Sequence, residues 1–293
     1  MTGTTSASVT GTTSASAIAA ARLVESLEQL GVELVFGLPG VHNLPIWKAL
    51  SQSPIRLVGV RHEQTAAYAA DGYARATGRL GVAVVTTGPG AANTLGATGE
   101  AMAASSPVLV IATDTASALR REGVYRGTLH ETRDQTAMFV PVTKAARAVG
   151  GAEEVATAVL ELGALALSAP TGPVYLGVPT DLLSKPVSGS ASVNAAVAET
   201  AHPLPSEDAL DRAAVALAEA ERPLIWAGGG ALRAGAGPAV GELALKLAAP
   251  VLTTFMGRGL LSPEHPCAVP GPAHAPEVGA LWDEADVVLA VGS

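Results

Sequence analysis

Short, unbroken apolar segments recur through the first two thirds of the chain, and each is followed by a stretch with helical spacing. The clearest segments are 55–60, 80–87 and 107–112. Strands that are apolar along their whole length are typical of parallel sheets covered on both faces. Their alternation with helices predicts a doubly wound α/β fold, with a parallel sheet flanked by helices. Further strands are expected at 32–36, 144–149 and 173–179, and helices at 17–30, 44–50, 91–103 and 152–168.

A second α/β unit is expected after a segment rich in Ser, Ala and Pro. We expect a low-complexity tail at 1–16, a first domain at 17–186, a linker at 187–205 and a second, Rossmann-like domain at 206–293. In the second domain we expect a helix at 207–220 and strands at 223–227 and 251–254, and residues 285–293 are predicted to form a buried parallel strand. A natural domain seldom ends on such a strand, so we expect a truncated chain with an incomplete second domain.

The composition limits the class of protein. The 293 residues suffice for two domains, and 48% hydrophobic with 15% charged residues allows a large core. The net charge of −8 argues against a nucleic-acid or anionic-membrane surface. The lone Cys267 excludes a disulfide framework and a thiolate metal cage.

The amino terminus also argues against export. The heptad TGTTSAS occurs at 2–8 and again at 10–16, without the basic and apolar regions of a secretory signal. No apolar run approaches the roughly 20 residues that span a bilayer. A reducing, cytoplasmic location is the simplest interpretation.

Glu63 lies at the junction between the apolar segment 55–60 and a helix of small residues. A carboxylate at such a junction can face a cleft, but it can also simply stabilise the positive end of the helix. A second junction follows at Gly88-Pro89-Gly90 and Asn93, where two glycines allow close approach to a flat ring. A third turn contains Pro39-Gly40.

The run 61–78, taken with the turn at 88–93, resembles the pyrimidine-binding domain of thiamine-diphosphate enzymes, in particular the acetolactate synthase and benzoylformate decarboxylase group. The resemblance implies that Glu63 is catalytic: it hydrogen-bonds the pyrimidine ring and favours the tautomer that removes the thiazolium proton. It further implies that thiamine diphosphate is contacted by residues of the other two turns, namely Pro39, Gly40, Gly88, Pro89, Gly90 and Asn93.

Two histidines are candidates for the substrate side of the site. Some related lyases and carboligases carry a histidine at the position of His42, where it could relay protons. His130 stands where acetolactate synthases have glutamine, which puts acetolactate specificity in doubt. Both histidines could instead be ordinary loop residues. Arg120, Arg121 and Arg126 could attract an anionic substrate, although loop arginines are usually just solvated.

The resemblance covers the first domain and about half of the second. Members of the family bind the diphosphate through Mg²⁺ in a third domain that carries Gly-Asp-Gly, which does not occur in this sequence. The metal ligands are therefore expected outside this chain, and a site shared between subunits implies a homodimer or homotetramer. Gly228-Gly229-Gly230 is similar to a segment that holds FAD in acetolactate synthase. It does not match G-x-G-x-x-G, so a structural turn is favoured and FAD stays open.

These observations favour the N-terminal portion of an enzyme that decarboxylates or joins 2-keto acids. One alternative is a half-site subunit that needs a separate diphosphate-binding chain. Another is an ordinary nucleotide-binding α/β protein in which Glu63 only caps a helix. The sequence leaves the keto acid, the acceptor and the choice between dimer and tetramer open.

Overall fold

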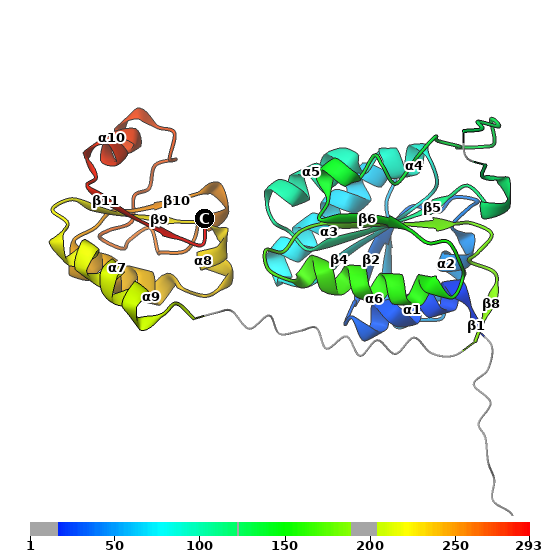
Figure 1. Cartoon of the computed structure of the whole chain (residues 1–293), viewed down its shortest axis with the longest axis horizontal. Coiled ribbons are helices and arrows are strands. Elements are labelled where there is room, and N and C mark those ends of the chain that lie inside the picture. The colour runs from blue at the N-terminus through cyan, green and yellow to red at the C-terminus, as the bar shows by residue number, and fades with distance from the viewer. Residues whose placement is uncertain (1–16, 122, 189–203) are drawn as a thin grey trace, which may run out of the picture. The chain divides into compact units, whose positions relative to one another are not determined.

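The computed structural model describes residues 17–121, 123–188 and 204–293 (Figure 1). The expected tail at 1–16 and the 189–203 part of the expected linker lie outside the described residues. The chain divides into two compact units, 1–200 and 201–293, and each is described by itself. The domain bounds given above, 17–186 and 206–293, stay predictions.

The first unit is built on a six-stranded parallel sheet with strand order β3-β2-β4-β5-β7-β6. The strands are β2 (Leu34–Gly37), β3 (Arg56–Gly59), β4 (Gly81–Val85), β5 (Val108–Asp114), β6 (Ala145–Ala148) and β7 (Val174–Pro179). Every residue of β4, β5 and β7 is buried. Complete burial explains their unbroken apolar sequences. The predicted doubly wound α/β fold is confirmed.

Helices cover both faces of this sheet (Figure 1). One face carries α1 (Ala19–Gln29), α2 (Leu44–Leu50) and α6 (Glu154–Leu167), over a core dominated by Leu, Val and Ile. The other carries α3 (Glu63–Thr77) and α5 (Leu95–Ala103), over a core made largely of alanines. The small side chains of this second face let the helices lie close to the sheet.

The strand order reverses at β2. The chain runs outward from β2 to β3 and then returns to β4 on the other side of β2. In open parallel sheets, ligands bind at the carboxyl ends of the strands where the order reverses. The segments that follow β2, β3 and β4 all leave from this edge, and they contain the residues predicted to bind the cofactor.

Two local expectations for the first unit need correction. The single helix predicted at 91–103 is two helices, α4 (Pro89–Ala92) and α5. At the break the Thr94 N–H donates to the carbonyl of Ala91, three residues back, and the Thr94 hydroxyl donates to the same carbonyl at 2.7 Å. The helix predicted from residue 17 begins at Ala19, because Ala17–Ile18 forms strand β1 and pairs with β8 (Pro186–Val187). The long polar segment after β5 contains two short 3₁₀ helices, η1 (Ser117–Leu119) and η2 (Val140–Val142).

The second unit contains a three-stranded parallel sheet with strand order β10-β9-β11. Its elements are α7 (Glu207–Glu219), β9 (Pro223–Ala227), α8 (Gly229–Arg233), α9 (Gly237–Leu247), β10 (Val251–Thr253), η3 (Phe255–Gly257), α10 (Pro276–Glu284) and β11 (Val287–Val291). The prediction that the last strand is buried is wrong. Within the described residues one face of β11, with Val288 and Ala290, is left exposed, while Leu289 and Val291 on the other face pack against the core of the unit.

The three consecutive glycines of the second unit have a packing role. The Gly228 N–H donates to the Val291 carbonyl, and the Gly230 N–H donates to the Gly292 carbonyl, both at 2.9 Å. A Cβ at Gly228 would lie 2.2 Å from the Gly292 carbonyl oxygen. The glycines thus let the start of α8 approach the end of β11, as expected for a structural turn.

Candidate functional site

Glu63 is the first residue of α3 and is half-buried at the carboxyl edge of the sheet. The cap of this helix is His62, whose Nδ1 accepts from the Gln64 N–H at 3.2 Å. The Glu63 carboxylate is directed elsewhere: its Oε2 accepts from Asn93 Nδ2 at 2.9 Å. Because His62 caps the helix, the Glu63 carboxylate is not needed as the cap and instead pairs with Asn93 at this edge of the sheet.

The turn after β4 brings its two glycines to Glu63 and His130. A Cβ at Gly90 would lie 3.4 Å from Glu63 Oε1. Gly88 has φ +62° and ψ −110°, a backbone conformation that glycine adopts readily. A Cβ at Gly88 would lie 2.3 Å from the His130 carbonyl oxygen. Between the two glycines, Pro89 is exposed and begins α4.

The turn after β2 packs against the turn after β4. Asn43 is fully buried and fixes the first turn: its Oδ1 accepts from the Gly40 N–H at 2.8 Å, and its Nδ2 donates to the Leu38 carbonyl at 3.1 Å. A Cβ at Gly40 would lie 2.6 Å from Thr86 Oγ1. Pro39 precedes this contact and is exposed. The structure thus gathers the residues of all three predicted turns at one edge of the sheet.

Thr86 supplies a test of whether this edge fits a polar ring. Its Oγ1 is buried and has no hydrogen-bond partner among the described residues. The hydroxyl faces Gly40, and a Cβ at Gly90 would lie 2.6 Å from Thr86 Cγ2. An unsatisfied hydroxyl, two glycines and the Glu63–Asn93 pair fit a flat heterocycle that has hydrogen-bonding atoms on its rim.

His42 and His130 also meet, although they come from segments far apart in the sequence. Their ring centroids are 5.8 Å apart with the planes at 77°. The backbone of His42 is anchored by the Thr180 hydroxyl, which donates to the His42 carbonyl at 2.9 Å. Burial, and then the neighbouring His130, lower the pKa of His42. The pair therefore places a neutral imidazole near the turns at neutral pH.

We expect His42 to titrate below the ordinary histidine pKa of 6.5. A His130→Asn variant should raise the pKa of His42 only in part, because burial is the larger cause and persists. NMR titration of the ring protons of His42 checks both statements. The lowered pKa also makes stability depend on pH. As pH falls through about 6.5, His42 of the unfolded chain binds a proton more readily than His42 of the folded chain, so the free energy of unfolding falls. A His42 pKa that is unchanged in the variant would contradict the coupling.

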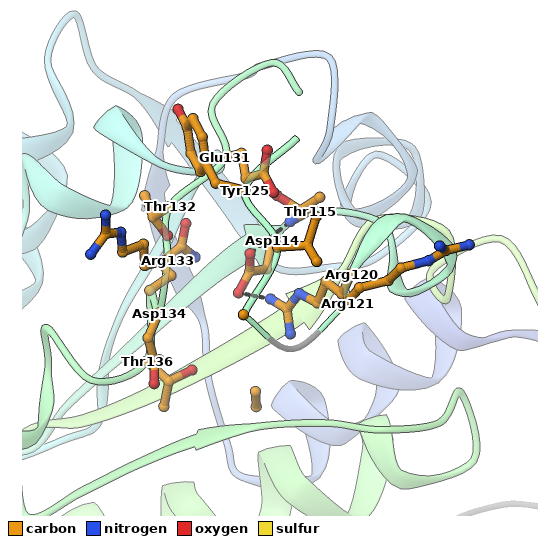
Figure 2. A pocket seen from close by; sticks show the side chains of 14 residues that line it. Asp114, Thr115, Arg120, Arg121, Tyr125, Glu131, Thr132, Arg133, Asp134 and Thr136 are labelled. Carbon is orange, nitrogen blue, oxygen red and sulfur yellow. Dashed lines mark hydrogen bonds and ion pairs between the residues drawn. The ribbon is translucent and has the colours of Figure 1, made fainter. Parts of the chain in front are cut away.

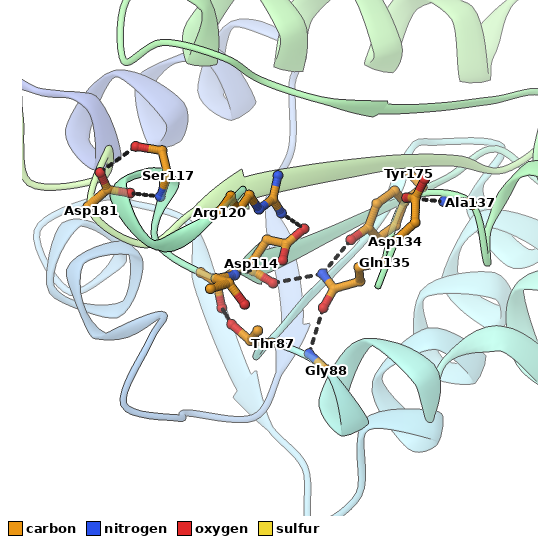
Figure 3. Close-up of polar contacts among 12 residues, drawn as sticks. Thr87, Gly88, Asp114, Ser117, Arg120, Asp134, Gln135, Ala137, Tyr175 and Asp181 are labelled. Atoms are coloured by element: carbon orange, nitrogen blue, oxygen red, sulfur yellow. Dashed lines mark hydrogen bonds and ion pairs between the residues drawn. The ribbon is translucent and has the colours of Figure 1, made fainter. Parts of the chain in front are cut away.

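A buried polar network lies behind the turn after β4 (Figure 3). Gln135 joins the Gly88 N–H to the end of β5 and to Tyr175, and Thr87 Oγ1 donates to Thr113 Oγ1 at 3.0 Å. Gln135 was not predicted from the sequence, because it stands in a polar, charged segment that is typical of a solvated loop. Its neighbour Asp134, whose carboxylate accepts from the Ala137 N–H, gives no signal that the next side chain is buried.

A cavity of about 790 Å³ opens beside this network (Figure 2). Asp114 and Arg120 form an ion pair at its wall, so Arg120 is not a free cation for a substrate. Arg121 also lines the cavity, whereas Arg126 does not. The catalytic, cofactor and histidine candidates do not line it, namely Glu63, Pro39, Gly40, Gly88, Pro89, Gly90, Asn93, His42 and His130. Gln135 belongs both to its wall and to the network behind Gly88.

In the part of the chain that the structure describes, no three or more His, Cys, Asp or Glu side chains are grouped so that they could hold a metal ion. No helix in the same residues is long and apolar enough to cross a membrane.

Two known protein domain families match this chain. Residues 18–138 match the N-terminal TPP binding domain of thiamine pyrophosphate enzymes, and residues 210–293 match the central domain of the same enzymes. This chain belongs to the thiamine pyrophosphate enzymes. The resemblance inferred from the sequence is confirmed, and the match does not favour an ordinary nucleotide-binding protein.

The chain is similar to several curated members of the family. It is 42% identical to the probable 2-ketoarginine decarboxylase AruI of Pseudomonas aeruginosa, over 92% of this chain and 48% of the relative. It is 34% identical to a probable acetolactate synthase large subunit of Methanocaldococcus jannaschii, over 92% of this chain and 46% of the relative. It is 36% identical to the acetolactate synthase large subunit IlvG of Mycobacterium tuberculosis, over 97% of this chain and 50% of the relative. The chain thus spans about half the length of these relatives.

Proposed function

We propose that this chain supplies the pyrimidine-binding half of an active site that converts 2-keto acids by decarboxylation, carboligation or both. The observation that carries the proposal is the Glu63 carboxylate, held by Asn93 beside Gly90 where the strand order reverses. Decarboxylases and acetolactate synthases of the same family support the reaction class.

Thiamine diphosphate, when bound, supplies the carbon nucleophile that adds to the keto group. The role of this chain is to recognise its pyrimidine ring. Glu63 would share a proton with a ring nitrogen, and the backbones of Gly40 and Gly88 would approach the ring. Pro39, Pro89 and Gly90 would shape the two turns, and Asn93 would orient the carboxylate of Glu63.

His42 and His130 would face the substrate. A neutral His42 can accept a proton from a hydroxyl or, once protonated, return it to a carbonyl-derived oxygen. Their contact with each other lets one imidazole bias the charge of the other. The position of His130 against Gly88 connects the substrate side to the cofactor side.

The remaining parts of the site would come from outside the described residues. We propose that Mg²⁺ and the diphosphate are held by a diphosphate-binding domain outside residues 1–293. A site completed by a second subunit fits a homodimer or homotetramer. The alternative is a half-site subunit whose site is completed by a separate diphosphate-binding chain. No observation supports FAD, since the glycines of α8 pack against the chain itself.

The experiment is an assay of CO₂ release by the full natural polypeptide, with and without thiamine diphosphate and Mg²⁺. The panel includes pyruvate, benzoylformate and 2-ketoarginine; the last is included because the decarboxylase relative is 42% identical, against 34% and 36% for the two acetolactate synthases. We expect cofactor-dependent release from at least one 2-keto acid. Release that is equal with and without thiamine diphosphate would refute the proposed function.

A further inference from the structure

Gln135 is a buried amide at the junction of the turn after β4 and the core. Only 2% of its surface is exposed. Its Oε1 accepts from the Gly88 N–H at 2.6 Å, while its Nε2 donates to the Thr113 carbonyl at 2.8 Å and to the Tyr175 hydroxyl oxygen at 2.7 Å (Figure 3). The acceptor and both donor hydrogens are therefore used, which fixes the orientation of the amide.

The Tyr175 end of this network is rigid. Tyr175 and Phe139 are fully buried, and their rings stack with centroids 3.8 Å apart and planes at 9°. Burial raises the pKa of Tyr175 far above its ordinary value, so the phenol stays neutral. A neutral hydroxyl locked in a stacked pair gives Gln135 a fixed point of attachment.

The Gly88 end of the network is a turn that needs such support. The backbone of Gly88 has a positive φ, and the His130 backbone leaves no room for a side chain there. The hydrogen bond to Gln135 fixes the direction of the peptide N–H at this point. Two residues further on, Gly90 lies against the Glu63 carboxylate.

We propose that Gln135 is a positioning residue of the pyrimidine site. It holds the Gly88 peptide so that Gly90, Asn93 and Glu63 are arranged for the ring before the cofactor arrives. The proposal rests on the proposed function and adds to it a residue that touches neither cofactor nor substrate. It implies that loss of the amide weakens cofactor binding in a protein that is still folded.

The first test replaces Gln135 by leucine in the full natural polypeptide. The Gly88 N–H then loses its partner, and we expect the apparent Kd for thiamine diphosphate to rise about 10-fold or more. At saturating cofactor the KM for the 2-keto acid should stay near the wild-type value, because His42 and His130 are both kept. Titration of cofactor-dependent CO₂ release measures both constants.

A Gln135→Glu variant supplies a readout that a purely structural role would not produce. A protonated carboxyl can still accept from Gly88 and donate one hydrogen, whereas an ionised carboxylate faces the Thr113 carbonyl oxygen. We therefore expect the cofactor affinity of this variant to improve as pH falls, relative to wild type at each pH. The ionisable groups around the position are the paired Asp114 and Arg120, Asp134, Tyr175, His130 across Gly88 and, in the wall of the same cavity, Arg121, Glu131 and Arg133. All of them are shared with wild type.

The control is Val159→Ala, a fully buried position on α6 at the opposite face of the sheet. This change should lower the melting temperature and leave the cofactor Kd unchanged. If the wild type is active and Gln135→Leu binds thiamine diphosphate with the wild-type Kd, the role of Gln135 is overturned and the proposed function stands. Should the leucine variant fail to fold, the Gln135→Glu variant decides, and an affinity that follows wild type at every pH overturns the proposal. A wild type that needs no thiamine diphosphate refutes the function itself.

Discussion

Replacing Glu63 by glutamine is expected to lower kcat for the 2-keto acid by about 10²- to 10⁴-fold, the usual contribution of a positioned acid or base. The amide keeps the shape of the side chain and can still contact Asn93, but it cannot share a proton with a ring nitrogen. The fold should persist because His62, and not Glu63, caps α3. The assay is cofactor-dependent CO₂ release in the full natural polypeptide, at saturating thiamine diphosphate.

Glu154 gives a matched control for this experiment. It also lies in the first turn of a helix, where its Oε2 accepts from the Gly150 N–H at 3.1 Å, but it belongs to α6 on the opposite face of the sheet. A first-turn carboxylate that only stabilises its helix contributes about 0.3 to 1 kcal/mol. If Glu63→Gln and Glu154→Gln both keep the wild-type kcat, Glu63 is only a helix-end charge.

Replacing Gly88 by alanine is expected to lower the free energy of unfolding by roughly 2 to 4 kcal/mol, from backbone strain together with overpacking. The new Cβ would need a positive φ and would lie 2.3 Å from the His130 carbonyl oxygen. The turn would have to move, so cofactor affinity should fall as well. Urea unfolding followed by circular dichroism measures the first effect, and cofactor titration in the full natural polypeptide measures the second.

The comparison for Gly88 is Gly78, which ends α3 with φ +71° and has no atom within 4 Å of a Cβ. Gly78→Ala should therefore cost only the conformational part, about 1 kcal/mol. It should leave cofactor binding unchanged. Equal losses of stability in the two variants would show that the contact with His130 does not constrain the turn.

The sheet was predictable because burial on both faces removes the polar alternation that would otherwise interrupt a strand. The same logic failed at β11, because an apolar strand sequence does not state whether other elements cover both of its faces. Glu63 and the three turns were predictable because each follows a recognisable strand. Whether Glu63 and these turns lie close together depends on the order of the strands in the sheet, and the spacing of residues along the sequence does not determine that order.

Gln135 could not be predicted for a different reason. Its neighbours in the sequence are charged, and the groups it binds lie 22 to 47 residues away along the chain. A buried amide of this kind is recognisable only when the acceptors and donors around it are in place. The break between α4 and α5, where the Thr94 hydroxyl donates to a backbone carbonyl, was not predicted either.

The short antiparallel pair β1 and β8 joins residues 17–18 to residues 186–187. The polypeptide therefore enters and leaves its first unit at the same point. Such a unit can be cut out, transplanted or opened at a new position with little rearrangement, because its natural ends already lie side by side. In evolutionary terms, a unit built this way can be recombined with different partner domains while its own sheet stays intact.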